Sequence, residues 1–440
     1  MLRTRARNVL LNSIVRFRLP YVGVLALLCC QPLFSYAVLT HEAIIDSAWD
    51  QNIKPLLLQR FPQSTAADLM EAHGYAYAGC IIQDMGYYPK SKKFFSDLIH
   101  YARSGDFVLN LIREAQSLNE LAFALGALAH YAADSNGHPI AVNRSVALEY
   151  PRLARKYGRV VTYGDDHLSH LKVEFGFDIL QVARGNYAPQ SYHDFIGFHV
   201  PTPVVERAFR DTYCLELSDI FDDLDEAFGT FRHVVSKTIP EATRVAWRLK
   251  GKELAQARPG LTRRAFVYNL SKASYRKEWD DRYQRPGFGA TVLAFVIRII
   301  PKFGPLKVLE FHIPTAQTEK LFEDSFDRTL AEYRGLLSSL RANQLNKLEN
   351  IDLDTGKPTR PTEYILADQT YATLAVQLAS VPSENIDPKL RANVLEYYRD
   401  LDLPFDTKRH SKDWKKTLDA LATLKAAPTV TGNSPAQTAH

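Results

Sequence analysis

The sequence is poor in cysteine, and this scarcity limits the classes of protein to which it can belong. Only four cysteines occur in 440 residues, and two of them, Cys29 and Cys30, lie in the N-terminal segment. A disulfide-stabilised scaffold is therefore excluded, while Cys80 and Cys214 either form one bridge or stay free thiols. The sequence also lacks a glycine-rich phosphate loop, a nucleophile elbow and a Cys-His arrangement, which excludes the chemistries that depend on them.

Acidic residues are missing from the start of the chain. None precedes Glu42, whereas five arginines lie in the first 18 residues. An apolar run, Tyr21–Cys30, follows, and then small residues at Ser35 and Ala37. This order predicts an export signal over residues 1–37 and a periplasmic or secreted protein; an uncleaved amphipathic anchor is the alternative. Beyond this segment basic and acidic residues balance, so net charge does not indicate nucleic acid.

The rest of the chain has the three-and-four spacing of apolar residues that is typical of helices, and alternating runs are scarce. We therefore predict an all-α, multi-helix bundle with a helical C-terminal extension. The clearest helical segments are Ala43–Phe61, Leu118–Ala133, His167–Arg184, Leu217–Lys237, Phe322–Leu345 and Asp368–Ala379. The expected divisions are a catalytic domain over 38–250, an extension over 251–425 that is basic at first and then mixed, and a disordered tail over 426–440.

Histidines are concentrated in one part of the sequence: seven of the 13 lie between His41 and Glu174. Two of them form His-x-x-x-carboxylate pairs, His130 with Asp134 and His170 with Glu174. Residues four apart share one face of a helix, and apolar neighbours mark these faces as buried. His138 continues the first stripe unless Asn136 and Gly137 end the helix. Two such pairs predict metal ligands inside a bundle, although a single pair is more often structural.

Taken together, the order of candidate ligands resembles the zinc-dependent phospholipase C family, which is related to the single-strand-specific fungal zinc nucleases. The resemblance is specific from Leu39 to Gly176 and rests on residues that keep the family's order: His41, Asp84, His100, His130, Asp134, His138, His170 and Glu174. It implies a mostly helical fold that holds two to three zinc ions in a cleft.

The resemblance also implies a role for each residue. Asp84, His100 and His130 would hold one zinc, and Asp134 would bridge it to a second. The trio His138, His170 and Glu174 would hold a zinc nearer the open cleft. His41, Asp134 and the amino group freed by signal cleavage would complete the remaining site. Asp84 is also the candidate general base. Three residues separate Asp134 from His138, fewer than the family usually has.

The predicted activity is phosphoester hydrolysis of the phospholipase C type, because clustered zinc supplies hydroxide and neutralises phosphoryl charge. The family tends to have Glu in the last pair when the substrate is a phospholipid and Asp when it is a nucleic acid, so Glu174 favours phospholipid. A single-strand nuclease or 3′-nucleotidase on the same site is one alternative. A non-catalytic, metal-binding, membrane-associated protein is the other. The sequence predicts no protein partner.

A basic stretch follows the catalytic segment. Residues 244–302 contain 14 Lys or Arg and four acidic residues, and they lead into the apolar segment 288–303. An apolar segment with basic flanks indicates peripheral membrane contact; a buried core helix is the alternative. Aromatic residues are interleaved with the basic ones, among them Tyr275 and Trp279, and this pattern is equally typical of a site that binds single-stranded nucleic acid.

Overall fold

The structure is a computed structural model that describes residues 38–88, 90–184, 199–233, 249–256 and 310–426. These residues are almost entirely helical, and their only sheet is one short antiparallel pair of strands, so the all-α prediction is confirmed. The predicted export signal, the apolar segment 288–303 and residues 427–440 of the predicted tail lie outside the described residues.

The described residues up to His233 form twelve α-helices and three other helical turns. They are α2 (Val38–Ala48), η1 (Trp49–Ile53), α3 (Lys54–Arg60), α4 (Ala66–Gly79), η2 (Ile82–Tyr87), α5 (Lys93–Tyr101), α6 (Ser104–Glu114), α7 (Leu118–Gly137), η3 (His138–Val142), α8 (Asn143–Glu149), α9 (Pro151–Tyr157), α10 (His167–Arg184), α12 (Thr202–Tyr213), α13 (Leu217–Ile220) and α14 (Leu224–His233). The C-terminal part contains α19 (Ala316–Arg341), β1 (Ile351–Asp352), β2 (Lys357–Pro358), α20 (Ile365–Leu378), η8 (Ser383–Asn385), α21 (Pro388–Tyr397), η9 (Asp406–Arg409) and α22 (Ser411–Ala426).

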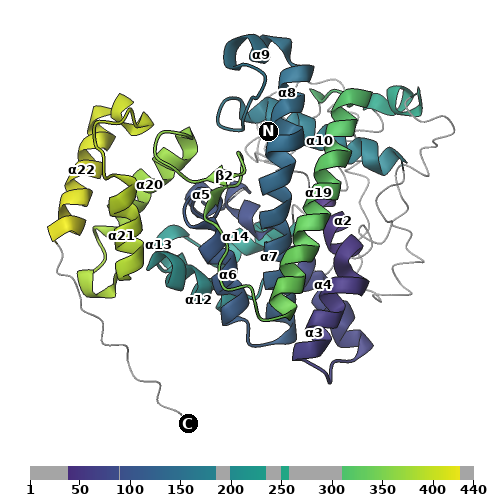
Figure 1. The fold of residues 1–440 in the computed structure, drawn as a ribbon, viewed down its shortest axis with the longest axis horizontal. Coiled ribbons are helices and arrows are strands. Elements are labelled where there is room, and N and C mark those ends of the chain that lie inside the picture. The colour runs from purple at the N-terminus through teal and green to yellow at the C-terminus, as the bar shows by residue number, and fades with distance from the viewer. Residues whose placement is uncertain (1–37, 89, 185–198, 234–248, 257–309, 427–440) are drawn as a thin grey trace, which may run out of the picture.

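The helix α7 forms the centre of the bundle. It packs against α2, α4, α6 and α19, and Figure 1 shows α7 and α19 running side by side. Its N-terminus is capped by Ser117, whose hydroxyl oxygen accepts the Glu120 N–H (3.2 Å). From Leu121 onward nearly every residue is buried. A buried polar side chain is costly without a partner. The buried polar residues of α7 therefore indicate a binding site rather than a solvent-exposed face.

Two glycines allow α4 and α7 to approach each other closely. A Cβ at Gly79 would overlap the Phe123 carbonyl oxygen, and a Cβ at Gly126 would overlap the Ala76 carbonyl oxygen. Both obstacles are helical backbone, which cannot swing aside like a side chain. This contact fixes α7 at the depth from which its polar residues reach the candidate metal centre.

We expect Gly126→Ala to lower the free energy of unfolding by about 3 kcal/mol, because the added methyl forces two buried helices apart. Thermal and urea unfolding measure this loss. The matched control is Gly335→Ala on α19, where a Cβ would meet nothing within 4 Å. That change should be neutral or stabilising by about 0.5–1 kcal/mol, since alanine favours helix. Equal losses in both variants would show that close packing is not the cause.

The structure decides one alternative that the sequence left open and corrects one predicted helix. Asn136 and Gly137 do not turn the chain away: α7 passes directly into the π-helical turn η3, in which the Asn143 N–H donates to the His138 carbonyl. Pro139, which has no N–H, accounts for this wider turn. The helix expected over 217–237 is broken between α13 and α14.

Cys80 and Cys214 are both free thiols, which settles the alternative that the sequence left open. Cys80 is buried, and its thiol donates to the Tyr77 carbonyl (3.2 Å). The sulfur of Cys214 instead accepts the Asp387 N–H (3.2 Å). Burial raises the pKa of the Cys80 thiol well above its usual value. Neither thiol lies in the candidate ligand set, so the site uses only imidazole and carboxylate.

Candidate metal centre

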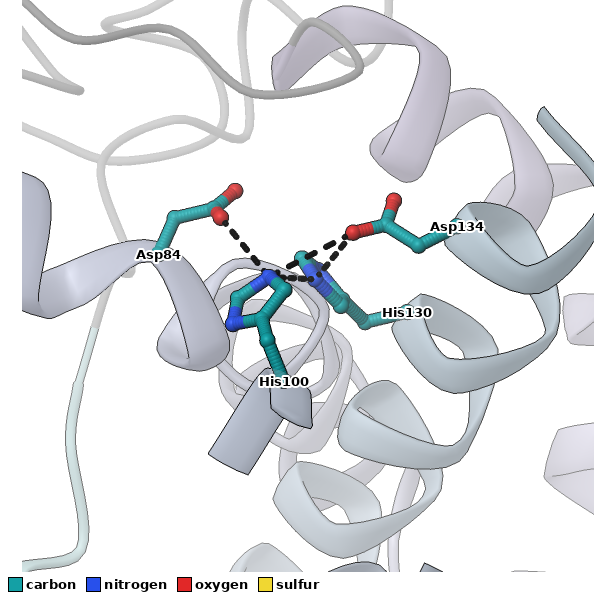
Figure 2. Close-up of side chains that lie close together, drawn as sticks. All are labelled: Asp84, His100, His130 and Asp134. Carbon is teal, nitrogen blue, oxygen red and sulfur yellow. Dashed lines mark hydrogen bonds and ion pairs between the residues drawn. The ribbon is translucent and has the colours of Figure 1, made fainter. Parts of the chain in front are cut away.

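Four of the predicted ligands form one compact group (Figure 2). Asp84 comes from η2, His100 from α5, and His130 and Asp134 from successive turns of α7. The His100 Nε2 lies 3.4 Å from Asp84 Oδ1 and 3.5 Å from Asp134 Oδ2. The His130 Nε2 lies 2.9 Å from Asp134 Oδ2 and 3.4 Å from His100 Nε2. One ligand atom from each residue fits within 4.8 Å of the others, which is the spacing a single ion requires.

Three further predicted ligands form a second group beside the first. His138 begins η3, and His170 and Glu174 lie one turn apart on α10. Glu174 Oε1 is 3.0 Å from His170 Nε2 and 3.9 Å from His138 Nε2. His138 Nδ1 is 2.9 Å from His170 Nε2. Their ligand atoms also lie within 4.8 Å of one another. All three side chains are buried, with at most 2% exposed.

Asp134 joins the two groups and also reaches the eighth predicted ligand. Its Oδ2 faces His100 and His130, while its Oδ1 lies 3.5 Å from both His41 Nε2 and His138 Nε2. His41 also stacks on His130, with 4.4 Å between ring centroids and 6° between planes. A carboxylate with one oxygen on each side is what a bridge between two cations requires. All eight predicted residues therefore meet in one buried cluster.

Two of the histidine rings are fixed by hydrogen bonds on the side that faces away from the cluster. His130 Nδ1 donates to the Cys80 carbonyl (2.9 Å), and His100 Nδ1 donates to the Ser96 carbonyl one turn earlier on α5 (2.8 Å). A main-chain carbonyl accepts only from a protonated nitrogen, so neutral forms of both rings present the Nε2 lone pair to the cluster. This arrangement is usual for metal-ligating histidine, because the outer bond sets tautomer and ring orientation.

The segment that carries His41 is held by a buried carboxylate on α10. Asp178 accepts the Leu39 N–H at Oδ2 (3.1 Å) and the Thr40 hydroxyl at Oδ1 (2.7 Å). Burial raises the pKa of Asp178 to about 7, although both hydrogen bonds act in the opposite direction. The start of α2 is thus tied to α10, one turn beyond Glu174.

The clustered groups shift one another's pKa strongly. Burial, assisted by His130, lowers the pKa of His41 to about 3. Burial opposes protonation of His100 and His138, but the carboxylate of Asp134 beside both rings outweighs it and raises the pKa of both. Burial first, then the negative charge of Asp134, raises the pKa of Glu174 well above its usual value. Burial and the neighbouring His138 lower the pKa of His170 well below its usual value.

The donor set fits zinc. Both carboxylate oxygens of Asp134 and of Glu174 are buried, and they accept no hydrogen bond of ordinary geometry from any residue that the structure describes. Within the same described residues, the ion pairs of these two carboxylates are all with histidine. Buried oxygens of this kind are costly unless a cation satisfies them. Imidazole nitrogen and carboxylate oxygen are ligands that zinc takes in four-coordinate sites.

The structure adds one carboxylate that the sequence analysis missed. Asp354, beyond β1, places its Oδ1 3.6 Å from His138 Nδ1. No local signal pointed to it: it lies more than 200 residues from His138, in a segment without helical periodicity. Two histidines that the spacing left out of the ligand set lie elsewhere. His73 stacks on Trp49 (3.9 Å between centroids) and bonds Asp46 (3.0 Å), and His167 packs edge-on against Tyr163.

A comparison with protein families confirms the resemblance predicted from the sequence. Residues 40–222 match the family described as zinc dependent phospholipase C. The matched range contains all eight predicted ligands and covers less than half of the chain. No curated protein and no solved structure matches the chain. Among the described helices, none is long and apolar enough to cross a membrane.

Proposed function

We propose that this protein is an exported phosphodiesterase of the phospholipase C type, which hydrolyses the headgroup phosphoester of a phospholipid. The observation that carries the proposal is the buried cluster of eight imidazole and carboxylate groups, centred on Asp134, inside the family-matched range. Such a cluster has no structural purpose that apolar packing would not serve better. Its composition suits a group of divalent cations that act on a phosphoester.

The ligands are assigned by the two groups and the bridge between them. Asp84, His100, His130 and Asp134 would hold one zinc, and the second group, His138, His170 and Glu174, would hold another. His41 and Asp134 would contribute to a third, with the amino group exposed by removal of residues 1–37. When bound, zinc supplies a Lewis acid and a water molecule acidified to near neutrality. Asp84, 2% exposed with Oδ1 turned to the cluster, is retained as ligand and general base.

Glu174 is the residue that favours phospholipid over nucleic acid. It occupies the last position of the ligand order, where the resemblance associates Glu with lipid substrates, and its carboxylate faces both His138 and His170. The apolar segment 288–303 is proposed to contact the membrane surface that presents the substrate. The experiment distinguishes a phospholipase from a nuclease and from a non-catalytic metal-binding protein.

We would test the function with purified zinc-loaded protein on phosphatidylcholine vesicles and on single-stranded DNA and RNA. Release of phosphocholine and diacylglycerol, with both nucleic acids intact, is the expected result. Cleavage of the nucleic acids alone would replace the proposal with the nuclease. Two or more bound ions without turnover of any phosphoester would leave a metal-binding protein. A variant with Asp134→Asn, prepared identically, controls for a contaminating hydrolase.

A further inference from the structure

Asp354 brings a further carboxylate to the metal centre from outside the family-matched residues 40–222. It follows strand β1 and is 3% exposed. Its Oδ1 lies 3.6 Å from His138 Nδ1, on the opposite side of the ring from Asp134, whose Oδ1 lies 3.5 Å from His138 Nε2. The imidazole of His138 is therefore held between two carboxylates, one inside the ligand cluster and one behind it.

The carboxylate of Asp354 is fixed by its other contacts. Its Oδ2 accepts hydrogen bonds from the hydroxyls of Tyr101 (3.0 Å) and Tyr364. The Asp354 carbonyl accepts from Asn143 Nδ2 (2.8 Å), and its N–H donates to Asp352 Oδ1 (3.0 Å). With Oδ2 engaged by two hydroxyls, Oδ1 is the oxygen turned toward His138. A carboxylate bound on this many sides has one orientation and little freedom to leave it.

The segment that carries Asp354 is also bound to the helices of the metal centre. The Leu353 N–H donates to the carbonyl of His100 (3.2 Å), itself a proposed ligand. The Ser104 hydroxyl donates to the Ile351 carbonyl (2.6 Å), and the Tyr131 hydroxyl donates to the Glu349 carbonyl (2.9 Å). Gly356, with φ +66°, lies so close to the Ser135 carbonyl that a Cβ would overlap it. Residues 349–356 thus rest directly on α5, α6 and α7.

We propose that Asp354 is a positioning residue of the metal centre: its carboxylate, in ion-pair contact with His138 Nδ1, orients the ring so that Nε2 faces Asp134 and the bound ion. The inference rests on the proposed zinc-dependent function. His100 and His130 have main-chain carbonyls hydrogen-bonded to Nδ1, and Asp354 approaches Nδ1 of His138 as a charged neighbour at 3.6 Å. Carboxylate–histidine–metal arrangements of this kind set the tautomer and raise the basicity of the ligand.

The carboxylate is needed because His138 Nδ1 has a second neighbour. His170 Nε2, which belongs to another proposed ligand, lies 2.9 Å from His138 Nδ1. The negative charge of Asp354 favours a proton on Nδ1 of His138 and so leaves Nε2 as the ligand atom. It follows that the C-terminal extension completes the metal centre, and that residues 38–250 without it lack one of its parts.

The test compares Asp354→Asn with Asp352→Asn in the full-length chain. Asp352 is the matched control: it is buried in the same hairpin but bonds the Asp354 N–H and the Thr355 hydroxyl, not a histidine. We would measure zinc per chain against a competing chelator, the absorption of the cobalt-substituted protein, and the melting temperature after chelation. For Asp354→Asn we expect about 10- to 100-fold weaker affinity for one ion, a changed cobalt spectrum and an unchanged melting temperature of chelated protein.

Unchanged zinc affinity in Asp354→Asn, beside a wild type that binds its ions, would overturn this inference and leave the proposed function standing. Equal losses in both variants would overturn it too, because the hairpin rather than the carboxylate would then be responsible. If Asp354→Asn is insoluble, Tyr364→Phe removes one donor to the carboxylate, and about fivefold weaker affinity is expected; no change would overturn the inference. A wild type that binds no zinc would overturn both proposals.

Discussion

Asp134→Asn is expected to lower phosphodiesterase activity by at least about 10³-fold and to reduce bound zinc by at least one ion per chain. Asp134 is the only one of the eight proposed ligands whose two oxygens face both groups, with Oδ2 toward His130 and Oδ1 toward His138 and His41. An amide retains the size of the side chain but offers a single neutral oxygen. A 10³-fold loss corresponds to about 4 kcal/mol of transition-state stabilisation, which is within the range attributed to a metal ion.

The matched control for this prediction is Asp46→Asn. Asp46 bonds His73 at 3.0 Å, nearly the distance between Asp134 and His130, but the pair lies against Trp49 and outside the metal centre. Its amide variant should retain full zinc content and activity. Elemental analysis and phosphocholine release are measured on the same preparations. If Asp134→Asn retains both its zinc and its activity, the bridging role and the proposed function are wrong together.

The parts of the site that local spacing determines could be predicted from the sequence. His130 and Asp134 share a face of α7 because they are four residues apart, and the same spacing places His170 beside Glu174 on α10. Which of these pairs meets Asp84 and His100 depends on how helices pack, and that information came from the family resemblance. The order of residue types along the chain, not their periodicity, identified the whole set.

Tertiary packing determines what the sequence did not show. Asp354 reaches His138 because the hairpin that carries it packs on three helices. A single Asp in a polar loop and a two-residue strand show no hydrophobic periodicity by which the sequence could have identified them. Backbone contact between α4 and α7 depends on Gly79 and Gly126, which no pattern in the sequence singles out. The sequence left open whether Asn136 and Gly137 end the helix before His138. The π-helical turn η3 follows α7 directly and continues the stripe.

Zinc affinity is expected to fall steeply between pH 8 and pH 6. In protein stripped of metal, Asp134 raises the pKa of His100 and His138 against the effect of burial, and burial with Asp134 raises the pKa of Glu174. A raised pKa means that each group holds its proton to a higher pH than usual, and zinc must displace that proton because only the deprotonated forms are ligands. Each proton that zinc displaces weakens the apparent zinc affinity about tenfold for every unit by which the pH falls. Two displaced protons therefore weaken it about 100-fold per pH unit.

Proton release upon zinc binding measures this directly. Isothermal titration at pH 7 in buffers of different ionisation enthalpy should show two to three protons released as the two ligand groups fill, and Glu174→Gln should release one fewer. Competition with a chelator at pH 6, 7 and 8 gives the affinities. Equal affinity at all three pH values, or an unaltered proton count in Glu174→Gln, would mean that these groups are not the ligands.

The chelated protein should show the opposite pH dependence of stability. His100, His138 and Glu174 have folded-state pKa values above the unfolded ones, as do two buried carboxyls, Asp178 at about 7 and Asp352 at about 8. Groups of this kind stabilise the fold at low pH, and the stabilisation is lost as the pH rises through the folded-state values. Stripped protein should therefore melt at lower temperature at pH 8 than at pH 6, whereas saturating zinc should remove or reverse the difference. On this expectation, protons on the groups with raised pKa values would stabilise the buried cluster at low pH, and bound zinc would stabilise it at high pH.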